Sequence, residues 1–299
     1  MKKNHYLMRV LGVASTISLL LSGFTKTSDD TPYQIEIKAW HNQRVENLKK
    51  ENGWLNLAGL FWLEKGKNAF GNSSTNKIIF PIGKSDDFLG NLILEKGEVF
   101  IETTPDKAIY ANDEQVTKLK IFPSEKPVIL KHKSLRWFVI KRGDKYGIRL
   151  RDLESPFLKE FSGIETFPVD EKWKVKAKLV KEANKKIPIL DVLGHTNLQD
   201  SPGKLVFTID GKEHSLDALE EGDNLFIIFA DKTNKKETYG AGRFVYTPKP
   251  DENGVVLLDF NKSINPPCAF TPYATCPLPP KQNTLEIAIN AGEKNYRNH

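Results

Sequence analysis

Apolar residues recur every three or four positions in only one stretch of the chain. These residues are Ile37, Trp40, Val45 and Leu48, and charged and amide residues lie between them. This period places the four side chains near one face of a helix. It therefore predicts one amphipathic helix over residues 33–51, within the segment 31–53, and we expect no other long helix.

From Trp54 onward the apolar runs are short, and turn residues separate them, as in the runs 136–141 and 146–150. Many short strands at this spacing are typical of a β-sandwich or a β-barrel. The sequence predicts a mainly β fold in two packed parts. We expect a sandwich-like unit over residues 54–154 and a barrel-like unit over residues 155–294.

Two turns predict hairpins between strands that are neighbours in the sequence. The first turn, residues 64–67, joins the strand that follows Trp54 to the run 68–71. The second is rich in Pro, Asp, Asn and Gly, and it joins strand 243–247 to strand 255–260. Each pair of strands is expected to be antiparallel because the connection is short.

The second predicted hairpin brings an arginine close to an aspartate. Arg243 and Val245 share one face of their strand. If Val245 pairs with Leu257, Arg243 lies opposite Asp259, whereas a slip of one residue separates them. Such a pair is either a structural ion pair or part of a site for a carboxylate or phosphate ligand.

The predicted ligand site includes polar residues at this end of the hairpin and one histidine from a separate loop. They are Arg243, Asp259, Tyr239, Glu237, Asn265, Tyr273 and His195. For His195, a histidine with ordinary loop hydrogen bonds is the simpler interpretation.

The segment Asn265–Pro280 has an unusual composition. It holds both cysteines and six of the 17 prolines of the chain, together with Phe270 and Tyr273. Proline disfavours helices and central strands, while the apolar content is too high for a solvated linker. The composition predicts a rigid, partly buried loop across the mouth of a β structure.

The two cysteines, Cys268 and Cys276, have three possible roles. A disulfide is the ordinary expectation in an exported protein, and closing this loop would stabilise the fold by about 2–3 kcal/mol. Buried unpaired thiols are the first alternative, and a metal ligand or a nucleophile is the second. No histidines are spaced to complete a zinc site, so we expect no metal.

Two further arginines, Arg149 and Arg151, share one face of a predicted strand. Like charges in this position are expected to pair with carboxylates, such as Asp152 or Glu154, or to cover a sheet edge. Trp54, at the start of the first strand, could belong to an aromatic sugar platform. A core position is the simpler interpretation for it.

The N-terminus has the pattern of an export signal. A basic start precedes about a dozen apolar residues, which is typical of a secretory signal over residues 1–24 and short for a membrane span. Phe24 stands where a lipoprotein would carry its lipidated cysteine, so a periplasmic or extracellular protein without a lipid anchor is expected; an uncleaved signal anchor is the alternative. Without Lys2, Lys3 and Arg9, 41 basic residues face 38 acidic ones. A net charge of +3 does not predict a nucleic-acid partner.

Common catalytic and cofactor motifs are missing from the sequence. There is no Gly-x-Ser-x-Gly, His-Glu-x-x-His, Gly-x-x-x-x-Gly-Lys or Cys-x-x-Cys. Gly240-Ala241-Gly242 lacks the third glycine of a dinucleotide loop, and a bulge at a strand start is the better interpretation. We expect no cofactor.

The first β unit resembles a forkhead-associated β-sandwich in the strings GKNAFGNSSTNKIIFP, YANDEQV and YGIRLRD. Domains of that family read phosphothreonine with an arginine after the glycine and a Ser-x-x-His farther on. Asn72 follows Gly71 here, and no Ser-x-x-His is present. The resemblance therefore implies the fold alone.

Residues 54–294 also resemble a bacterial family known as domain of unknown function 1684. The strings that carry the resemblance are GLFWLEKGKNAFG, YGIRLRDLESP, KETYGAGRFVY and DFNKSINPPCAFTPYATCPLPP. The family name implies no activity and no catalytic residues.

These patterns favour an exported protein that binds a small polar or anionic ligand around residues 237–276. A hydrolase or lyase of envelope substrates, using Asp259, Glu237, His195 or a cysteine, is the first alternative. A structural or interaction module of the envelope is the second.

Overall fold

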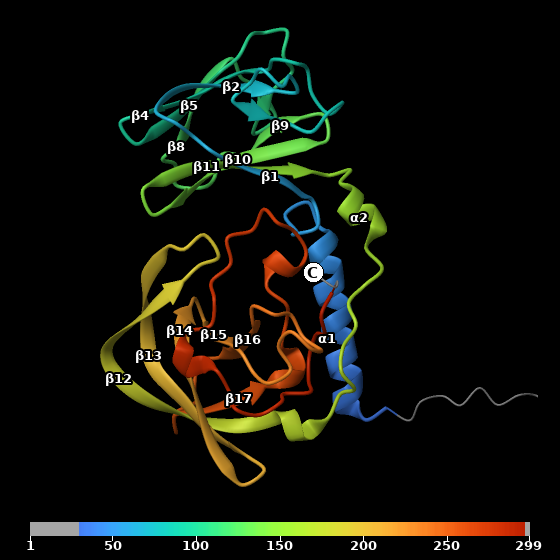
Figure 1. Ribbon diagram of the computed structural model, residues 1–299, viewed down its shortest axis with the longest axis vertical. Coiled ribbons are helices and arrows are strands. Elements are labelled where there is room, and N and C mark those ends of the chain that lie inside the picture. The colour runs from blue at the N-terminus through green and yellow to red at the C-terminus, as the bar shows by residue number, and fades with distance from the viewer. Residues whose placement is uncertain (1–29, 297–299) are drawn as a thin grey trace, which may run out of the picture.

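The computed structural model describes residues 30–296. The predicted signal, residues 1–24, therefore lies outside the described residues. Between residues 30 and 296, no helix has the length and apolar character needed to cross a membrane. The fold is mainly β, as predicted, with one long helix ahead of two β units built from three sheets (Figure 1).

Helix α1 (Pro32–Lys49) begins with a reciprocal cap. The Thr31 hydroxyl accepts a hydrogen bond from the Gln34 amide at 3.2 Å, and the Gln34 side chain accepts one from the Thr31 amide at 2.9 Å. This capping box satisfies two amides that the helix leaves unpaired. The helix predicted over residues 33–51 is thus present as Pro32–Lys49, and Ile37 and Leu48 are its buried side chains.

Two sheets form the N-terminal unit. The first has the order β1-β11-β10-β9-β6-β7. Its strands are β1 (Leu57–Trp62), β6 (Tyr110–Ala111), β7 (Glu114–Gln115), β9 (Leu130–His132), β10 (Leu135–Arg142) and β11 (Lys145–Asp152). The second has the order β3-β2-β4-β5-β8. Its strands are β2 (Gly66–Gly71), β3 (Ile78–Ile79), β4 (Gly90–Glu95), β5 (Glu98–Glu102) and β8 (Lys118–Phe122).

Both sheets contribute to one hydrophobic core. At its centre the rings of Phe70, Phe80 and Trp137 pack with centroids 5.3 to 5.9 Å apart. Offset and edge-on packing of this kind is the preferred geometry for aromatic rings. The sandwich-like character of the unit agrees with the sequence, while its specific likeness to a forkhead-associated domain stays a prediction.

A single curved sheet forms the C-terminal unit, with the order β16-β15-β14-β13-β12-β17. Its strands are β12 (Lys174–Leu190), β13 (Thr196–Ile209), β14 (Lys212–Glu221), β15 (Asn224–Phe229), β16 (Arg243–Pro248) and β17 (Val255–Asp259). The two edge strands approach each other, and the Thr247 hydroxyl donates to the Leu257 carbonyl at 3.0 Å. The sheet is therefore nearly closed, as a barrel-like unit requires.

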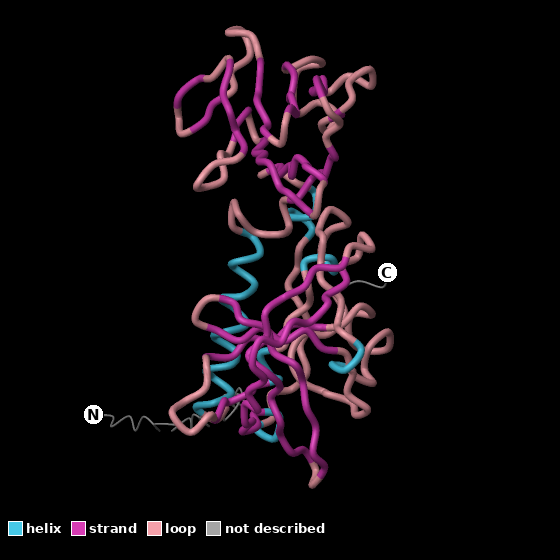
Figure 2. Tube along the Cα trace, turned by 90° about the vertical axis from the view of Figure 1, so that its left-hand side faces the viewer, coloured by secondary structure: helices cyan, strands magenta, loops and turns pink. Residues whose placement is uncertain are grey.

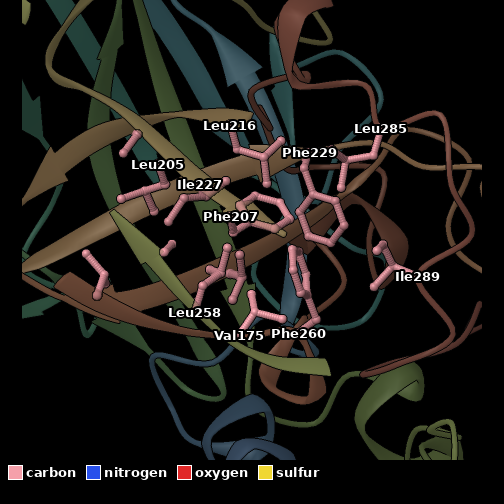
Figure 3. Close-up of a cluster of buried hydrophobic side chains, with 14 of the residues drawn as sticks. Val175, Leu205, Phe207, Leu216, Ile227, Phe229, Leu258, Phe260, Leu285 and Ile289 are labelled. Carbon is pink, nitrogen blue, oxygen red and sulfur yellow. The ribbon is translucent and has the colours of Figure 1, made fainter. Parts of the chain in front are cut away.

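Side chains from every strand of this sheet fill its interior (Figure 3). Phe207 on β13, Phe229 on β15 and Phe260 after β17 form its aromatic centre, with centroids 5.4 and 5.7 Å from Phe260. Leu285 and Ile289, from the segment after the last strand, close one side of the core. The C-terminal segment is thus part of the fold.

The two units lie end to end, with α1 alongside the C-terminal one (Figures 1 and 2). The short helices in the connections are α2 (Pro156–Glu160), η1 (Glu171–Trp173), η2 (Phe260–Lys262), η3 (Pro267–Ala269) and η4 (Lys281–Asn283). The orange-red loop that contains η3 rises toward the sheet of β10 and β11 (Figure 1). Side chains of the two units meet at this loop.

Both predicted hairpins are wrong. β1 pairs with β11, and β2 pairs with β3 and β4 in the other sheet, so the turn at residues 64–67 is a crossing between sheets. β16 pairs with β15, and β17 pairs with β12, at opposite edges of the curved sheet. A turn pattern shows where the chain reverses, and it does not specify which strand becomes the partner.

Candidate functional site

The proline-rich loop is anchored on the C-terminal unit. Ile264 and Phe244 exchange backbone hydrogen bonds at 2.8 and 2.9 Å. Farther along, the amide of Val192 donates to the Cys276 carbonyl at 3.0 Å, and the Leu278 amide donates to the Leu190 carbonyl at 2.7 Å. The loop thus connects the start of β16 with the end of β12, and backbone hydrogen bonds fix it at both places.

A cavity of about 530 Å³ lies between this loop, the sheet of β10 and β11, and the outer face of β15 and β16. Three arginines line it: Arg44, Arg142 and Arg149. One carboxylate, Glu221, and the aromatic or aliphatic side chains of Trp54, Phe226, Phe244, Tyr246 and Ile264 also line it. The loop contributes Asn265, Pro267, Ala274, Thr275, Cys276 and Pro277. The volume is within the range of small-molecule sites.

Two of these arginines converge on one neutral group. Arg142, at the end of β10, donates from Nε to the Thr275 hydroxyl at 3.1 Å. Arg149, on the neighbouring strand β11, donates from Nη2 to the same oxygen at 3.4 Å. Among residues 30–296, no carboxylate lies within ion-pair distance of either guanidinium. Two positive charges therefore share one uncharged acceptor.

Arg149 is the more deeply buried of the two, with 6% of its surface exposed. Its Nε is buried and has no hydrogen-bond partner in the described part of the chain. Burial, followed by the like charge of Arg142, lowers the pKa of the Arg149 guanidinium to about 10. The guanidinium lies 5.7 Å from the ring centroid of Trp54, a cation–π contact. An indole ring does not neutralise the charge.

Arg151, two residues along the same strand, makes a useful contrast. Its Nη1 donates to the Gly53 carbonyl and, at 2.7 Å, to the Asn56 side chain. The expectation that Arg149 and Arg151 pair with Asp152 or Glu154 is wrong, because Lys84 approaches both of these carboxylates. Arg151 is thus a structural residue, whereas Arg149 is held without a full set of partners.

The third arginine of the cavity, Arg44 on α1, has a carboxylate partner. Its Nε lies 3.3 Å from the carboxylate of Glu293, and its Nη2 donates to the Asn265 carbonyl at 3.2 Å. Burial raises the pKa of Glu293, while Arg44 and the Asn265 amide, which donates at 2.6 Å, act against this rise. Arg44 therefore connects α1 to the loop, and Glu293 already balances its charge.

The two cysteines lie against each other beside the cavity. Both are free thiols, and the Cys268 amide donates to the Cys276 sulfur at 3.1 Å. A hydrogen bond from Cys276 lowers the pKa of the Cys268 thiol, and the same contact, together with burial, raises the pKa of Cys276. Arg149 also lowers both values. The proximity suits the predicted disulfide, which stays a prediction.

Arg243 lies away from the cavity, in the interior of the C-terminal unit. It is fully buried, at 0% exposure. Its Nη2 donates to Asp231 at 2.8 Å and to the Ile289 carbonyl at 2.9 Å, and its Nη1 donates to the Ala291 carbonyl. The predicted contact with Asp259 is wrong, because β16 and β17 are not paired. Arg243 therefore connects the C-terminal segment to β16 through hydrogen bonds.

Three other predicted site residues make local contacts elsewhere in the fold: Asp259, Glu237 and His195. Asp259 accepts hydrogen bonds from the Tyr33 hydroxyl at 2.8 and 2.9 Å, and it caps η2. The backbone carbonyl of Glu237 accepts from the Asn295 amide at 2.9 Å. His195 Nδ1 is 3.7 Å from the Asp191 carboxylate. None of the three lines the cavity.

The remaining candidates lie in or near the proline-rich loop. Tyr239 packs in a hydrophobic cluster with Phe270, and burial, followed by the two thiols, raises its pKa to about 12. The amide of Tyr273 donates to the Thr271 hydroxyl at 3.3 Å. Asn265 lines the cavity, and of the seven predicted ligand residues it is the one that does. Across residues 30–296, no three His, Cys, Asp or Glu side chains are grouped to hold a metal ion.

No local sequence pattern indicates Arg142, Trp54 and Thr275 as members of one site. They come from β10, from the start of the N-terminal unit and from the loop, and they meet only when the two units are packed together. Arg149 did carry a signal. Two arginines that alternate along a mainly apolar strand put charge where burial is expected, and that conflict is typical of functional positions.

Comparisons with known proteins add a family and one structure. No curated protein matches the chain. A solution structure of an uncharacterized protein from Haloarcula marismortui is 29% identical, over 47% of this chain and 80% of that one, with a TM-score of 0.40. Residues 159–294, which include β15, β16 and the proline-rich loop, match the family described as protein of unknown function DUF1684, and this match confirms the resemblance over that range.

Proposed function

We propose that this protein binds a small anionic ligand in the cavity, with the guanidinium groups of Arg142 and Arg149 as its main partners. The observation that carries the proposal is the convergence of both groups on the neutral Thr275 hydroxyl, with Arg149 almost fully buried. A carboxylate or phosphate offers several acceptor oxygens and the opposite charge.

The energetics favour a bound anion over a purely structural role. Removing a charged group from water costs several kcal/mol unless a counter-charge or a full set of hydrogen bonds compensates. Arg149 has one long hydrogen bond and a buried Nε without a partner. A ligand that accepts hydrogen bonds from Nε of Arg149 and from Arg142 would supply both the missing acceptor and the missing negative charge.

The alternative functions have less support from the geometry. Of the residues predicted for a hydrolase or lyase, Cys276 alone lines the cavity. The contact with Cys268, together with burial, raises the pKa of this thiol, which makes it a poor nucleophile at neutral pH. A structural module remains the competitor, and it predicts that no anion stabilises the protein.

Thermal unfolding in rising concentrations of inorganic phosphate, at constant ionic strength, tests the proposal. Tenfold excess over the dissociation constant should stabilise the native state by about 1.4 kcal/mol, or roughly 2–4 °C in Tm. Arg149→Met should abolish the shift. Arg136→Met removes an arginine of β10 that pairs with Glu51, so it is the matched control and should keep the shift. Equal shifts in all three proteins would contradict the proposal.

We also propose that the protein is exported, on the basis of the signal pattern in residues 1–24. Amino-terminal sequencing of the protein recovered from the cell envelope checks this. A mature chain that starts near residue 25 is expected. Full-length chains starting at Met1 in the cytoplasmic fraction would contradict export.

A further inference from the structure

The cavity has two chemically different ends. Arg142 and Arg149 approach it from the N-terminal unit, while its opposite wall is the outer face of β15 and β16. That wall is aromatic. Phe226 and Tyr246 are stacked at 4.8 Å with an interplanar angle of 15°, and Phe244 meets Phe226 edge-on at 5.0 Å.

The aromatic wall is partly open. Tyr246 keeps 39% of its surface exposed, whereas Phe226 keeps 9%. Because the two rings face each other, Tyr246 is the member of the stack that stays accessible, and apolar loop residues, Pro267 and Ala274, continue the lining. An aromatic group that packs against Tyr246 gains both buried area and ring–ring contact.

A carboxylate accompanies the aromatic wall. Glu221, the last residue of β14, lines the cavity. Burial raises the pKa of Tyr246, the charge of Glu221 adds to the rise, and Arg44 acts against it. Among residues 30–296 no cation forms an ion pair with Glu221. A second negative charge on a ligand would be repelled at this end, because like charges at close range in a partly buried site are costly.

We infer that the ligand is an amphipathic anion: one anionic head group that reaches Arg142 and Arg149, and an aromatic body that packs against Tyr246. This inference rests on the proposed anion site and adds its selectivity. Small anions without an apolar body should bind weakly. Anions with a second charged group at the far end should be rejected through Glu221.

A series of matched carboxylates tests the inference on the full chain. Dissociation constants for acetate, benzoate and terephthalate are measured from the concentration dependence of Tm, at constant ionic strength. Benzoate is expected to bind at least tenfold more tightly than acetate, and terephthalate more weakly than benzoate. Inorganic phosphate and phenyl phosphate form a second pair, with the same preference for the aromatic member.

Two variants separate the head from the body. Tyr246→Ala should reduce benzoate affinity toward that of acetate and leave acetate binding unchanged. Glu221→Gln should bring terephthalate to the affinity of benzoate. Equal affinities for acetate and benzoate, both lost in Arg149→Met, would overturn this inference and leave the anion site standing. If none of the five anions binds, the proposed function fails as well.

Discussion

Arg149 on β11 donates a hydrogen bond to Thr275 in the proline-rich loop, across 126 positions of sequence. This contact joins the N-terminal sheet to the C-terminal unit, and it is made by a charged group to a neutral one. The same hydroxyl accepts from Arg142. The protein therefore holds two like charges together at the junction of its two units.

Replacing Arg149 should separate binding from stability. Arg149→Met replaces the guanidinium by an apolar side chain of similar length and so removes a buried charge. The free energy of unfolding should therefore rise by about 1 kcal/mol without ligand. Arg151→Met is the matched comparison. It should lose about 1–3 kcal/mol, because the Gly53 carbonyl and the Asn56 side chain lose their donor. Urea unfolding measures both, and a larger loss in Arg149→Met would make Arg149 structural.

Arg243 should prove essential to the fold. In Arg243→Met, Asp231 stays buried without its counter-charge, and the carbonyls of Ile289 and Ala291 lose their donor. A loss of about 3–5 kcal/mol is expected. Arg136→Met, at an ion pair whose Glu51 side is exposed, should change stability by less than about 1 kcal/mol. If chemical denaturation finds Arg243→Met as stable as Arg136→Met, this account of the C-terminal segment is wrong.

The two cysteines should pair when the protein is oxidised. Treatment with oxidised glutathione should link Cys268 to Cys276 with release of two molecules of reduced glutathione, and it should stabilise the native state by about 2–3 kcal/mol. Thiol counting under denaturing conditions should fall from two to zero. Cys268→Ser should gain no stability under the same treatment. Two titratable thiols after oxidation would exclude the bridge.

Burial of His41 should make stability depend on pH. Burial lowers the pKa of His41 below 6.5, and its Nε2 lies 3.0 Å from the Asn261 carbonyl. The unfolded state then binds the proton more readily, so this contribution is present above pH 6.5 and is lost as the pH falls toward the folded pKa. Asp259 opposes the shift and Arg44 adds to it.

The variant His41→Gln isolates this contribution, because an amide can replace the imidazole donor but does not titrate. Unfolding free energies measured between pH 7.5 and 5 should fall more steeply for the wild type than for the variant. Glu293 titrates with the opposite sign in both proteins, since burial raises its pKa, so it cancels in the comparison. Parallel profiles would show that His41 does not contribute.

The sequence predicted those parts of the structure that depend on local periodicity. The spacing of Ile37 and Leu48 specified α1, and the short apolar runs specified a mainly β fold. Strand partners were missed because β1 and β17 pair with strands far away in sequence. Local turn chemistry contains no information about such partners.

The candidate site was predicted in part. The unusual composition of Asn265–Pro280 singled out a loop that lines the cavity. Arg243 does not line the cavity, because it contacts the C-terminal segment, whose position no local pattern indicates. The choice of Arg142 and Arg149 requires the packing of one unit on the other. Long-range packing of this kind is accessible only in three dimensions.

A crystal structure of the protein grown with benzoate tests the anion site most directly. We predict a carboxylate in the cavity that accepts hydrogen bonds from Nε of Arg149 and from Arg142, with its ring against Tyr246. A cavity that holds no benzoate at a saturating concentration, or an Arg149 guanidinium paired with a carboxylate of the protein itself, would contradict the account.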